Sequence, residues 1–517
     1  MPSFPPARTD SSLGTRTSRF LWLTQALLLA SVLGMTSGQA QPTVEWVTVA
    51  GSLASEWPQD MALSPTGETL VVVTDRTWPA TGPETVLYKF DLKGTHTGSQ
   101  ASRGEDIQGV AVDSKGNYYL TGRVWDSERL GMGVVNDFYL AKYSSTGTLL
   151  WERATGSPGT DIKYETRGGS RISFDKAGNV LVAGYSSGPA AFGNVTFPSE
   201  TGGPLICKYD PAGGLLWAKR VEVRSTGFSG TGIGGIALDG EENIVICGYL
   251  YNGNVDFGGT SVKIAGPYGS DSFIAKFDRD GRPTWIRLGY AAGGVAVDRK
   301  GNIYFNCGKL NPAGEVEWVK RISGAYPGNV ALDFRGEPVF TMTGRDKWKW
   351  DEIAFNNSDG GGSLVILKAT SSGAFQWAIT DQGDAMPDFR LIRSDGAGNH
   401  YVTGALSCDY PNGVETCGSS TLGSFPLVTQ FGGQRDIFLT RLSEPVPVTV
   451  ELKIARTASG LALSWPTAQN GFVLESTEAL PAASWSAVPG TPSVVGDQSV
   501  VTVEAGGGAK FYRLRKP

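Results

Sequence analysis

The sequence predicts an all-β protein built from seven copies of one four-stranded unit, followed by a smaller β module. Three observations lead to this prediction. A strand–turn–strand sequence motif recurs along the chain, and a basic residue and a Trp follow it at regular spacing. The composition changes near Ser443. Repeats of this length indicate a propeller, a solenoid or another array.

The recurring phrase is a strand, a turn of the form D-x-x-G-N, a second strand and a Gly. The Asp side chain can accept hydrogen bonds from the backbone ahead of it, and the Gly supplies the positive φ that a tight hairpin needs. Apolar residues alternate with smaller or polar ones on both sides of the turn, which is typical of half-buried strands. The copies are Asp113–Gly122, Asp175–Gly184, Asp239–Gly248 and Asp298–Gly308, with looser ones at Ser64–Thr74, Asp333–Gly344 and Asp395–Gly404.

A second phrase follows each copy: an apolar strand that ends in a basic residue, then a turn, then a strand with a Trp. The basic residues are Lys89, Lys142, Lys208, Lys276, Lys309, Lys368 and Arg441. The Trp residues that follow the turn are Trp151, Trp217, Trp285, Trp318 and Trp377. Each copy therefore reads as a four-stranded antiparallel blade. One blade cannot bury its own faces but seven in a ring can, so we expect a seven-bladed β-propeller over residues 41–443.

Two details refine this expectation. The seventh copy stops after Asp436–Ser443 without a Trp strand, and Val44–Gly51 resembles such a strand, so we expect the N-terminal strand with Trp46 to close the last blade. In the fifth copy Gly308 runs almost directly into Lys309–Gly314, so that blade is expected to be shortened.

The first forty residues have the pattern of a signal peptide. Three Arg residues precede the apolar run Phe20–Gly34, and Gly38–Ala40 offers small residues for cleavage after Ala40. We therefore expect an exported protein that is secreted, periplasmic or associated with the cell surface. No later run is apolar and long enough to span a membrane. The net charge of −5 argues against nucleic acid as a partner.

Beyond the propeller we expect a linker at residues 444–452 and a small β-sandwich at residues 453–517. Alternating strands with Trp465 and Trp485 support the second module. Cys408 and Cys417 lie nine residues apart in one loop and are predicted to form a disulfide. The remaining Cys residues and the two His residues form no metal-binding pattern, so no metal and no cofactor are expected. We also expect the protein to be a monomer.

The phrase G-V-A-V-D-x-x-G-N followed by D-x-F-x-A-K and a Trp strand resembles the bacterial β-propeller repeat family of exported proteins. The resemblance covers about Val44–Ser443 and implies the seven-bladed fold, but it implies no catalytic residue. The segment from Leu463–Pro466 to the C-terminus is similar to fibronectin-like modules of secreted bacterial proteins.

In an antiparallel blade, the connection between the first and second strands and that between the third and fourth strands lie at the same end. The tight turns are therefore expected on one face of the ring and the long connections on the other. Loops on a rigid scaffold often bind ligands, and exposed aromatic residues stack on sugars or anchor protein contacts. Alternatively, these aromatic residues pack under their own loops as small cores. The candidate ligand-binding residues are Trp57, Trp78, Trp125, Trp348, Trp350, Tyr251 and Tyr410, with Tyr164, Tyr290 and Tyr326 on the same face.

Polar residues near the start of the inner strands form a second candidate site, at the mouth of the channel. They are Asp60, Asp106, Arg171, Asp388 and Arg390, with Asn329 in the same column. We expect an exported, non-enzymatic binding or scaffold protein whose partner is a glycan or an extracellular or envelope protein. The alternatives are a polysaccharide-degrading or lactone-cleaving enzyme that uses carboxylates at the mouth, and a purely structural role.

Overall fold

The computed structural model describes residues 41–517 apart from gaps, and every regular element in the described residues is a β-strand. The gaps are 53–54, 77–83, 103–105, 127–134, 156–168, 188–189, 198–201, 225–230, 252, 265–269, 291–292, 321, 352, 357–362, 384–385, 408–417, 431–434, 446–450, 458–459, 468–471, 481–483, 505–508 and 516–517. The all-β prediction is confirmed, and the predicted signal peptide lies outside the described residues. No helix in the described part of the chain is long and apolar enough to cross a membrane.

Between residues 43 and 443 the described strands pair antiparallel in seven groups of four, called units and numbered in chain order. A parallel pair between Ser55 and Arg435 joins units 7 and 1 in one eight-stranded sheet. Unit 1 holds β2 (Ser55–Leu63), β3 (Thr69–Arg76), β4 (Glu84–Phe90) and β5 (His96–Ala101), and unit 2 holds β6 (Asp106–Val112), β7 (Tyr118–Asp126), β8 (Val135–Tyr143) and β9 (Leu149–Thr155). Unit 3 holds β10 (Gly169–Phe174), β11 (Val180–Ser187), β14 (Gly202–Tyr209) and β15 (Leu215–Arg220), and unit 4 holds β17 (Thr231–Leu238), β18 (Ile244–Tyr251), β21 (Ser270–Phe277) and β22 (Pro283–Leu288). Unit 5 holds β23 (Val295–Val297), β24 (Ile303–Phe305), β25 (Gly308–Leu310) and β26 (Val316–Val319), and unit 6 holds β27 (Ile322–Leu332), β28 (Pro338–Trp350), β30 (Ser363–Ala369) and β31 (Phe375–Thr380). Unit 7 holds β33 (Met386–Ser394), β34 (Asn399–Ser407), β37 (Arg435–Ser443) and β1 (Thr43–Ala50).

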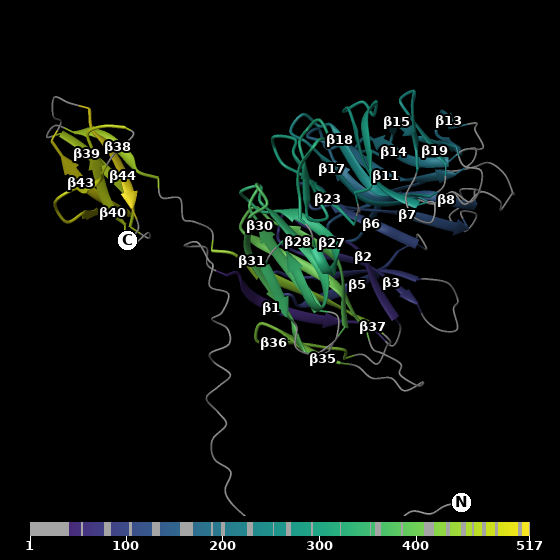
Figure 1. Cartoon of the computed structure of the whole chain (residues 1–517), viewed down its shortest axis with the longest axis horizontal. Helices are drawn as coiled ribbons and strands as arrows, with labels where there is room; N and C mark the ends of the chain where they lie inside the picture. Colours follow the sequence, from purple (N-terminus) through teal and green to yellow (C-terminus); the bar gives the residue numbers. More distant parts are fainter. Residues whose placement is uncertain are drawn as a thin grey trace, which may run out of the picture. The chain divides into compact units, whose positions relative to one another are not determined.

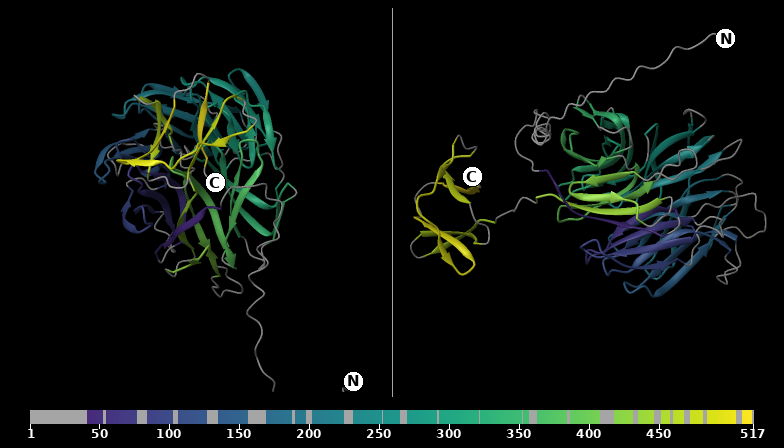
Figure 2. Two further views of the ribbon diagram at one scale, coloured as in Figure 1. Left: turned by 90° about the vertical axis from the view of Figure 1, so that its left-hand side faces the viewer. Right: turned by 90° about the horizontal axis from the view of Figure 1, so that it is seen from below.

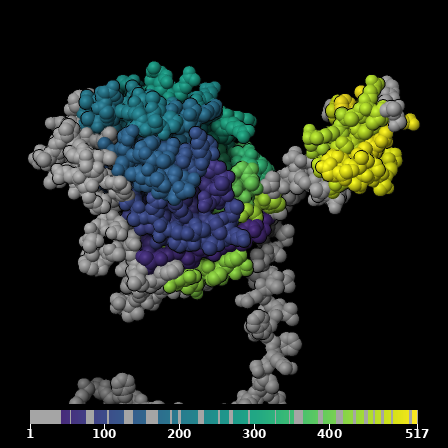
Figure 3. Space-filling view, turned by 180° about the vertical axis from the view of Figure 1, so that it is seen from behind, coloured from purple at the N-terminus to yellow at the C-terminus, as the bar shows by residue number. Residues whose placement is uncertain are grey.

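The first strands of the units contact one another in succession. The order is β2, β6, β10, β17, β23, β27 and β33, and β33 contacts β2 again. Figure 1 shows the sheets following one another in chain order, from purple through teal to green. The N-terminal β1 is the outermost strand of unit 7, because Thr43 pairs with Ser443 and Ala50 with Ile437. The earliest and latest strands of this region therefore lie side by side, as the further views show (Figures 2 and 3).

The repeated Asp residue organises the tight turns. The Asp113 Oδ1 atom accepts hydrogen bonds from the backbone N–H groups of Lys115 and Asn117, both at 2.9 Å, and Oδ2 accepts one from the Asn117 amide at 2.9 Å. Gly116 has a φ of 82°, a value that a residue with a Cβ rarely adopts. The local sequence therefore determines the turn without help from the rest of the fold.

In several units the Trp of the outer strand packs on a turn of the following unit. The indole N–H groups of Trp151 and Trp285 donate to the carbonyl oxygens of Pro211 and Pro312, each at 3.2 Å. Gly213 has a φ of +86°, and a Cβ at that position would lie 2.9 Å from the Trp151 ring. The turn therefore needs Gly both for its backbone conformation and for the close approach of the indole.

The basic residue that ends each third strand is paired with the turn Asp of the same unit in several copies. Lys208 lies 2.8 Å from Asp175, and Lys276 lies 2.9 Å from Asp239. These four side chains are largely buried, so each ammonium group compensates a carboxylate that burial would otherwise destabilise. In these copies the basic residue therefore stabilises its own unit.

Lys368 lies at the centre of the most buried version of this pair. Its ammonium group lies 2.6 Å from the carboxylates of both Asp333 and Glu444, and its side chain is fully buried. The Glu444 carboxylate also accepts the Trp377 indole N–H at 3.2 Å and lies 3.1 Å from His400 Nε2. Glu444, which the sequence assigned to the linker, is therefore part of the interface between units 6 and 7.

Unit 5 is shortened, and a hairpin of unit 6 covers it. Strands β24 and β25 have three residues each, and the end of β28 continues through a turn into β29 (Ile353–Asn356). Trp348 and Trp350 near the end of β28 are each 1% exposed, and they share one apolar cluster with Tyr304 and Cys307 of unit 5. The expectation that these two Trp residues are exposed for ligand binding is wrong. They fill the space that the short strands of unit 5 leave open.

The C-terminal residues form two sheets. One sheet has the order β38 (Lys453–Thr457), β39 (Gly460–Pro466), β43 (Gln498–Val503) and β42 (Ser493–Val495), and the other has the order β41 (Ser486–Ala487), β40 (Val473–Thr477) and β44 (Phe511–Arg515). Leu463, Trp465 and Val501 from the first sheet and Leu474 from the second form a common buried cluster. The two sheets therefore share one buried apolar cluster.

Candidate functional site

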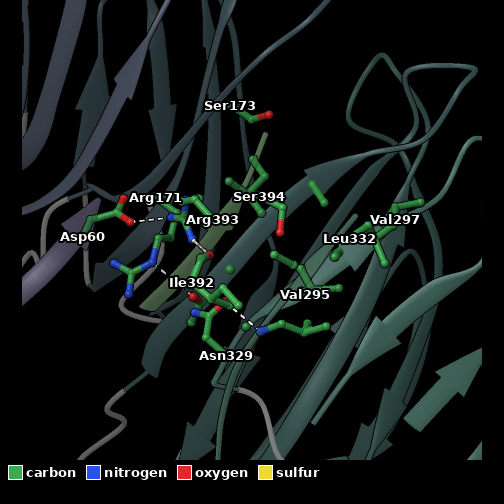
Figure 4. Close-up of a pocket in the computed structure, with 18 of the residues that line it drawn as sticks. Asp60, Arg171, Ser173, Val295, Val297, Asn329, Leu332, Ile392, Arg393 and Ser394 are labelled. Atoms are coloured by element: carbon green, nitrogen blue, oxygen red, sulfur yellow. Dashed lines mark hydrogen bonds and ion pairs between the residues drawn. The ribbon is translucent and has the colours of Figure 1, made fainter. Parts of the chain in front are cut away.

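A pocket with a volume of about 370 Å³ lies among the first strands of the units (Figure 4). Residues of β2, β10, β17, β23, β27 and β33 line it, so six of the seven units contribute. We call it the central pocket. Its polar side chains are Asp60, Arg171, Ser173, Asn329, Arg393 and Ser394. A cavity of this size with a few polar groups is typical of a ligand site.

Asp60 is held by three hydrogen bonds. One carboxylate oxygen accepts from the Met61 N–H at 2.9 Å and from the Arg393 guanidinium at 2.6 Å, and the other accepts from the Val110 N–H at 3.1 Å. Only 2% of the Asp60 residue is exposed. The side chain therefore joins units 7, 1 and 2, and its lone pairs are engaged within the protein.

Arg171 bridges two neighbouring units. Its Nε donates to the Gly234 carbonyl at 3.1 Å, and its Nη1 donates to the Gln108 carbonyl at 2.7 Å. These carbonyls belong to units 4 and 2, whereas Arg171 lies on β10 of unit 3. The predicted residues Asp60 and Arg171 are thus both in the central pocket.

The arginine that unit 7 contributes to the pocket is Arg393 and not the predicted Arg390. Arg390 lies at a β-bulge of β33, between Phe389 and Leu391, and its side chain is outside the described residues. The same bulge is present in units 1 to 4, and the residue that directly follows it, which is Asp60 in unit 1 and Arg171 in unit 3, is Leu391 in unit 7. Arg390 therefore lies one residue outside the column of Asp60 and Arg171. The signal in the sequence was an apolar residue, Ile392, followed by a charged one, Arg393; in the structure the first is buried and the second half-exposed.

The second predicted carboxylate, Asp106, forms an ion pair with Arg123 at 2.8 Å. Both side chains are largely buried, at 16% and 17% exposed. Asp106 does not line the central pocket. The side chain of Asp388, the third predicted carboxylate, lies outside the described residues. The described carboxylates at the mouth are therefore each paired with an arginine, and the two do not converge on one cavity.

The face opposite the tight turns carries hairpins inserted between the second and third strands. These are β12 (Ala190–Phe192) with β13 (Val195–Phe197), β19 (Asn254–Phe257) with β20 (Thr260–Lys263), and β35 (Ser419–Leu422) with β36 (Phe425–Val428), together with the β28–β29 hairpin. We call this the hairpin face. The hairpins pack back on the preceding unit, as when Phe192 contacts Phe138 of unit 2 at 5.6 Å between ring centroids. Similarly, β19 pairs with β16 (Glu222–Arg224) and β35 with β32 (Gln382–Gly383).

The other predicted aromatic residues fall into two groups. Trp57 is half-buried, and the Arg435 guanidinium lies 3.4 Å from the centre of its ring. Trp125 and Tyr251 lie at the ends of β7 and β18, but their side chains are outside the described residues, as are Trp78, Tyr410 and the predicted disulfide between Cys408 and Cys417. Tyr326 on β27 is 58% exposed, which makes it a better contact residue than the buried Trp pair.

The described cysteines are poor candidates for chemistry. Cys207, Cys247 and Cys307 are fully buried, and burial raises the pKa of the Cys247 thiol to about 12. A thiol in such surroundings is neutral and behaves as a small apolar side chain. Among the described residues no three His, Cys, Asp or Glu side chains are grouped as a metal site would require.

No protein-family model and no curated protein matches this sequence. Solved structures with a similar fold include the Dos1 propeller, at 10% sequence identity over 75% of this chain and 77% of that chain, with a TM-score of 0.38. A mutant of puromycin hydrolase complexed with PGG is similar at 12% identity over 79% of this chain and 58% of that chain, with a TM-score of 0.42. An ulvan lyase of a polysaccharide lyase family is similar at 9% identity over 81% and 93% of the two chains, with a TM-score of 0.31.

Proposed function

We propose that the protein is an exported, non-enzymatic binding protein built on a seven-bladed β-propeller with a fibronectin-like C-terminal module. Each unit is one blade in this proposal, unit 5 is the shortened blade, and β1 closes the ring. The ligand is a glycan or an extracellular protein that binds in the central pocket.

The observation that carries the proposal is the central pocket itself. Six units contribute strands to its wall, and polar side chains from β2, β10, β27 and β33 are held in place by hydrogen bonds across neighbouring units. A site built on strands keeps its geometry better than one built on loops, so little conformational entropy is lost when a ligand binds. The pocket is therefore favoured over the inserted hairpins, whose described aromatic residues pack into the body of the protein.

The enzymatic alternative receives less support from the geometry. A glycosidase or lyase of the predicted kind needs a carboxylate that can take up or release a proton beside the substrate. Asp60 already accepts three hydrogen bonds, and Asp106 is paired with Arg123 outside the pocket. We therefore favour binding over turnover.

The proposal can be tested with a glycan array and an array of extracellular proteins probed with the mature chain, residues 41–517. Ala237 lies on the pocket wall, so an A237F substitution should block the pocket and abolish binding of any hit. A K263A substitution on the exposed β19–β20 hairpin, which does not line the pocket, is the matched control and should bind normally. Equal binding by both variants, at equal stability in urea, would place the ligand elsewhere. Mass spectrometry of the recovered ligand tests the proposal that the protein is not an enzyme. A cleaved or rearranged ligand would show that it is one.

A further inference from the structure

We propose that His400 sets the hydrogen-bonding role of Ser394 in the central pocket. Ser394 accepts a hydrogen bond from a ligand while His400 is neutral, and it donates one when His400 is protonated. This inference rests on the proposed function and adds a specificity residue and a pH response to the same site. It begins from a chain of hydrogen bonds that runs from the wall of the pocket into the protein.

Three side chains form this chain. The Ser394 hydroxyl lies 2.7 Å from His400 Nδ1, and His400 Nε2 lies 3.1 Å from Glu444 Oε1. Ser394 lines the central pocket (Figure 4), whereas His400 is fully buried and Glu444 is 8% exposed. Among the described residues His400 is the one hydrogen-bond partner of the Ser394 hydroxyl. A hydroxyl has one donor and two acceptor positions, so capacity is left for a ligand.

The pair is specific to unit 7. Ser394 and His400 are cross-strand partners on either side of the tight turn. In the other units the residue at the position of Ser394 is apolar, and none of them has a histidine at the position of His400. The apolar residues are Leu63, Val112, Phe174, Leu238, Val297 and Leu332. The repeat therefore does not require a polar pair here.

Glu444 determines which nitrogen of His400 carries the proton. Its carboxylate accepts from the Lys368 ammonium at 2.6 Å and from the Trp377 indole N–H at 3.2 Å, and both of these groups can only donate. Burial opposes ionisation of Glu444, but hydrogen bonds from His400 and Lys368 hold its pKa below the usual value. Glu444 is therefore a carboxylate, and His400 Nε2 donates to it. In neutral His400 the Nδ1 atom is then an acceptor, which takes the proton of the Ser394 hydroxyl.

A proton on His400 reverses the hydrogen bond to Ser394. The imidazolium has an N–H on both nitrogens, so Nδ1 donates to the Ser394 oxygen and the hydroxyl proton turns to the pocket. A ligand hydroxyl or amide N–H that donates to Ser394 at neutral pH then meets a donor, and its hydrogen bond is lost. A ligand held through such a donor should therefore be released on acidification.

The charges near His400 favour this response. Lys368 lies 2.6 Å from both Asp333 and Glu444, so one ammonium is shared by two buried carboxylates and one negative charge is in excess. Glu337, at 3.6 Å from Lys368, adds a further carboxylate. An imidazolium at His400 would offset the excess negative charge of this group.

The direction of the hydrogen bond can be measured by ¹⁵N NMR of the mature chain, residues 41–517, labelled at histidine. The chain has two histidines, and H96Q assigns their signals. At pH 7.5 we expect His400 to carry its proton on Nε2, and on acidification Nδ1 should gain a second proton while the protein stays folded. A neutral ring with its proton on Nδ1 would overturn the inference, because Ser394 would then already accept from His400. A ring that stays neutral until the protein unfolds would overturn the pH response.

A cysteine probe tests whether the side chain at position 394 is both accessible from the pocket and coupled to His400. The S394C variant places a thiol beside His400 Nδ1, and the S173C variant, on the same pocket wall, is the matched control. At pH 6.5 iodoacetamide should alkylate S394C about tenfold or more faster than S173C, because a neighbouring imidazole favours the thiolate. Adding H400Q to S394C should remove the difference.

Peptide mass spectrometry follows both rates. No alkylation of S394C, or a rate equal to that of S173C, would overturn the inference. Neither experiment uses a ligand, so the two proposals can fail separately. Blank arrays together with the expected NMR and alkylation results would overturn the proposed function and leave the coupling of His400 to Ser394 intact.

Discussion

Replacing Lys368 by Met should be the most destabilising single change among the basic residues of the repeat. The ammonium group is fully buried and lies 2.6 Å from two carboxylates, those of Asp333 and Glu444, with Glu337 at 3.6 Å. Met has nearly the same length and leaves no large cavity, so the change isolates the loss of charge. Breaking a buried ion pair in this way costs about 3–5 kcal/mol, because the partner carboxylates remain buried without a cation.

K142M is the matched control, since Lys142 occupies the same column of the repeat in unit 2. Its ammonium group is also largely buried, but it lies 3.6 Å from a single carboxylate, that of Asp113, and not 2.6 Å from two. We expect a loss of about 1 kcal/mol or less from K142M. Urea unfolding followed by intrinsic fluorescence would measure both. At an m value of about 3 kcal/mol/M, the midpoint of K368M should fall by about 1 to 1.7 M. Equal midpoints for the two variants would refute the argument that burial of the carboxylates sets the cost.

Three further predictions concern packing, turns and pH. W348A and W350A should each lower the free energy of unfolding by about 3–5 kcal/mol, because the residues are 1% exposed in the cluster over unit 5; loss of ligand binding at unchanged urea midpoint would contradict their assignment to the core. G213A should cost about 1–3 kcal/mol, because Gly213 has a φ of +86° and a Cβ would lie 2.9 Å from Trp151. The same change at exposed Gly396, where a Cβ would meet nothing within 4 Å, should be nearly neutral in the same urea assay. Burial raises the pKa of Asp381 from 3.8 to about 6, so this carboxyl favours folding in its protonated form, and that contribution is lost as the pH rises from about 4 through 6. D381N should therefore gain stability relative to the wild type between pH 3.5 and 7.5, by an amount on the order of 3 kcal/mol, and a pH-independent difference would show that the carboxyl is not perturbed.

The candidate site could be predicted only in part. Asp60 and Arg171 were found because they occupy the same column of the repeat, and the structure brings both to the central pocket. Arg393 was missed because it lies outside the repeat column that holds Asp60 and Arg171, and it reaches Asp60 only because unit 7 lies beside unit 1. The burial of Trp348 and Trp350 was missed for a related reason. Their hairpin covers the preceding unit, and contacts between units leave no pattern within a single repeat.

The repeating local structure follows from the amino-acid sequence without any knowledge of the fold. The D-x-x-G-N turns, the alternating strands and the Gly–Trp spacing are interactions between residues close in the chain, so they can be read from any one copy. Which side chains are accessible depends instead on the tertiary structure. Asp60 and Arg393 are 333 positions apart, and Lys368 and Glu444 are 76 apart, yet each pair forms an ion pair of 2.6 Å. Burial and pairing of this kind depend on how the units are placed around one another, and it is these long-range contacts that determine the polar groups left for a ligand.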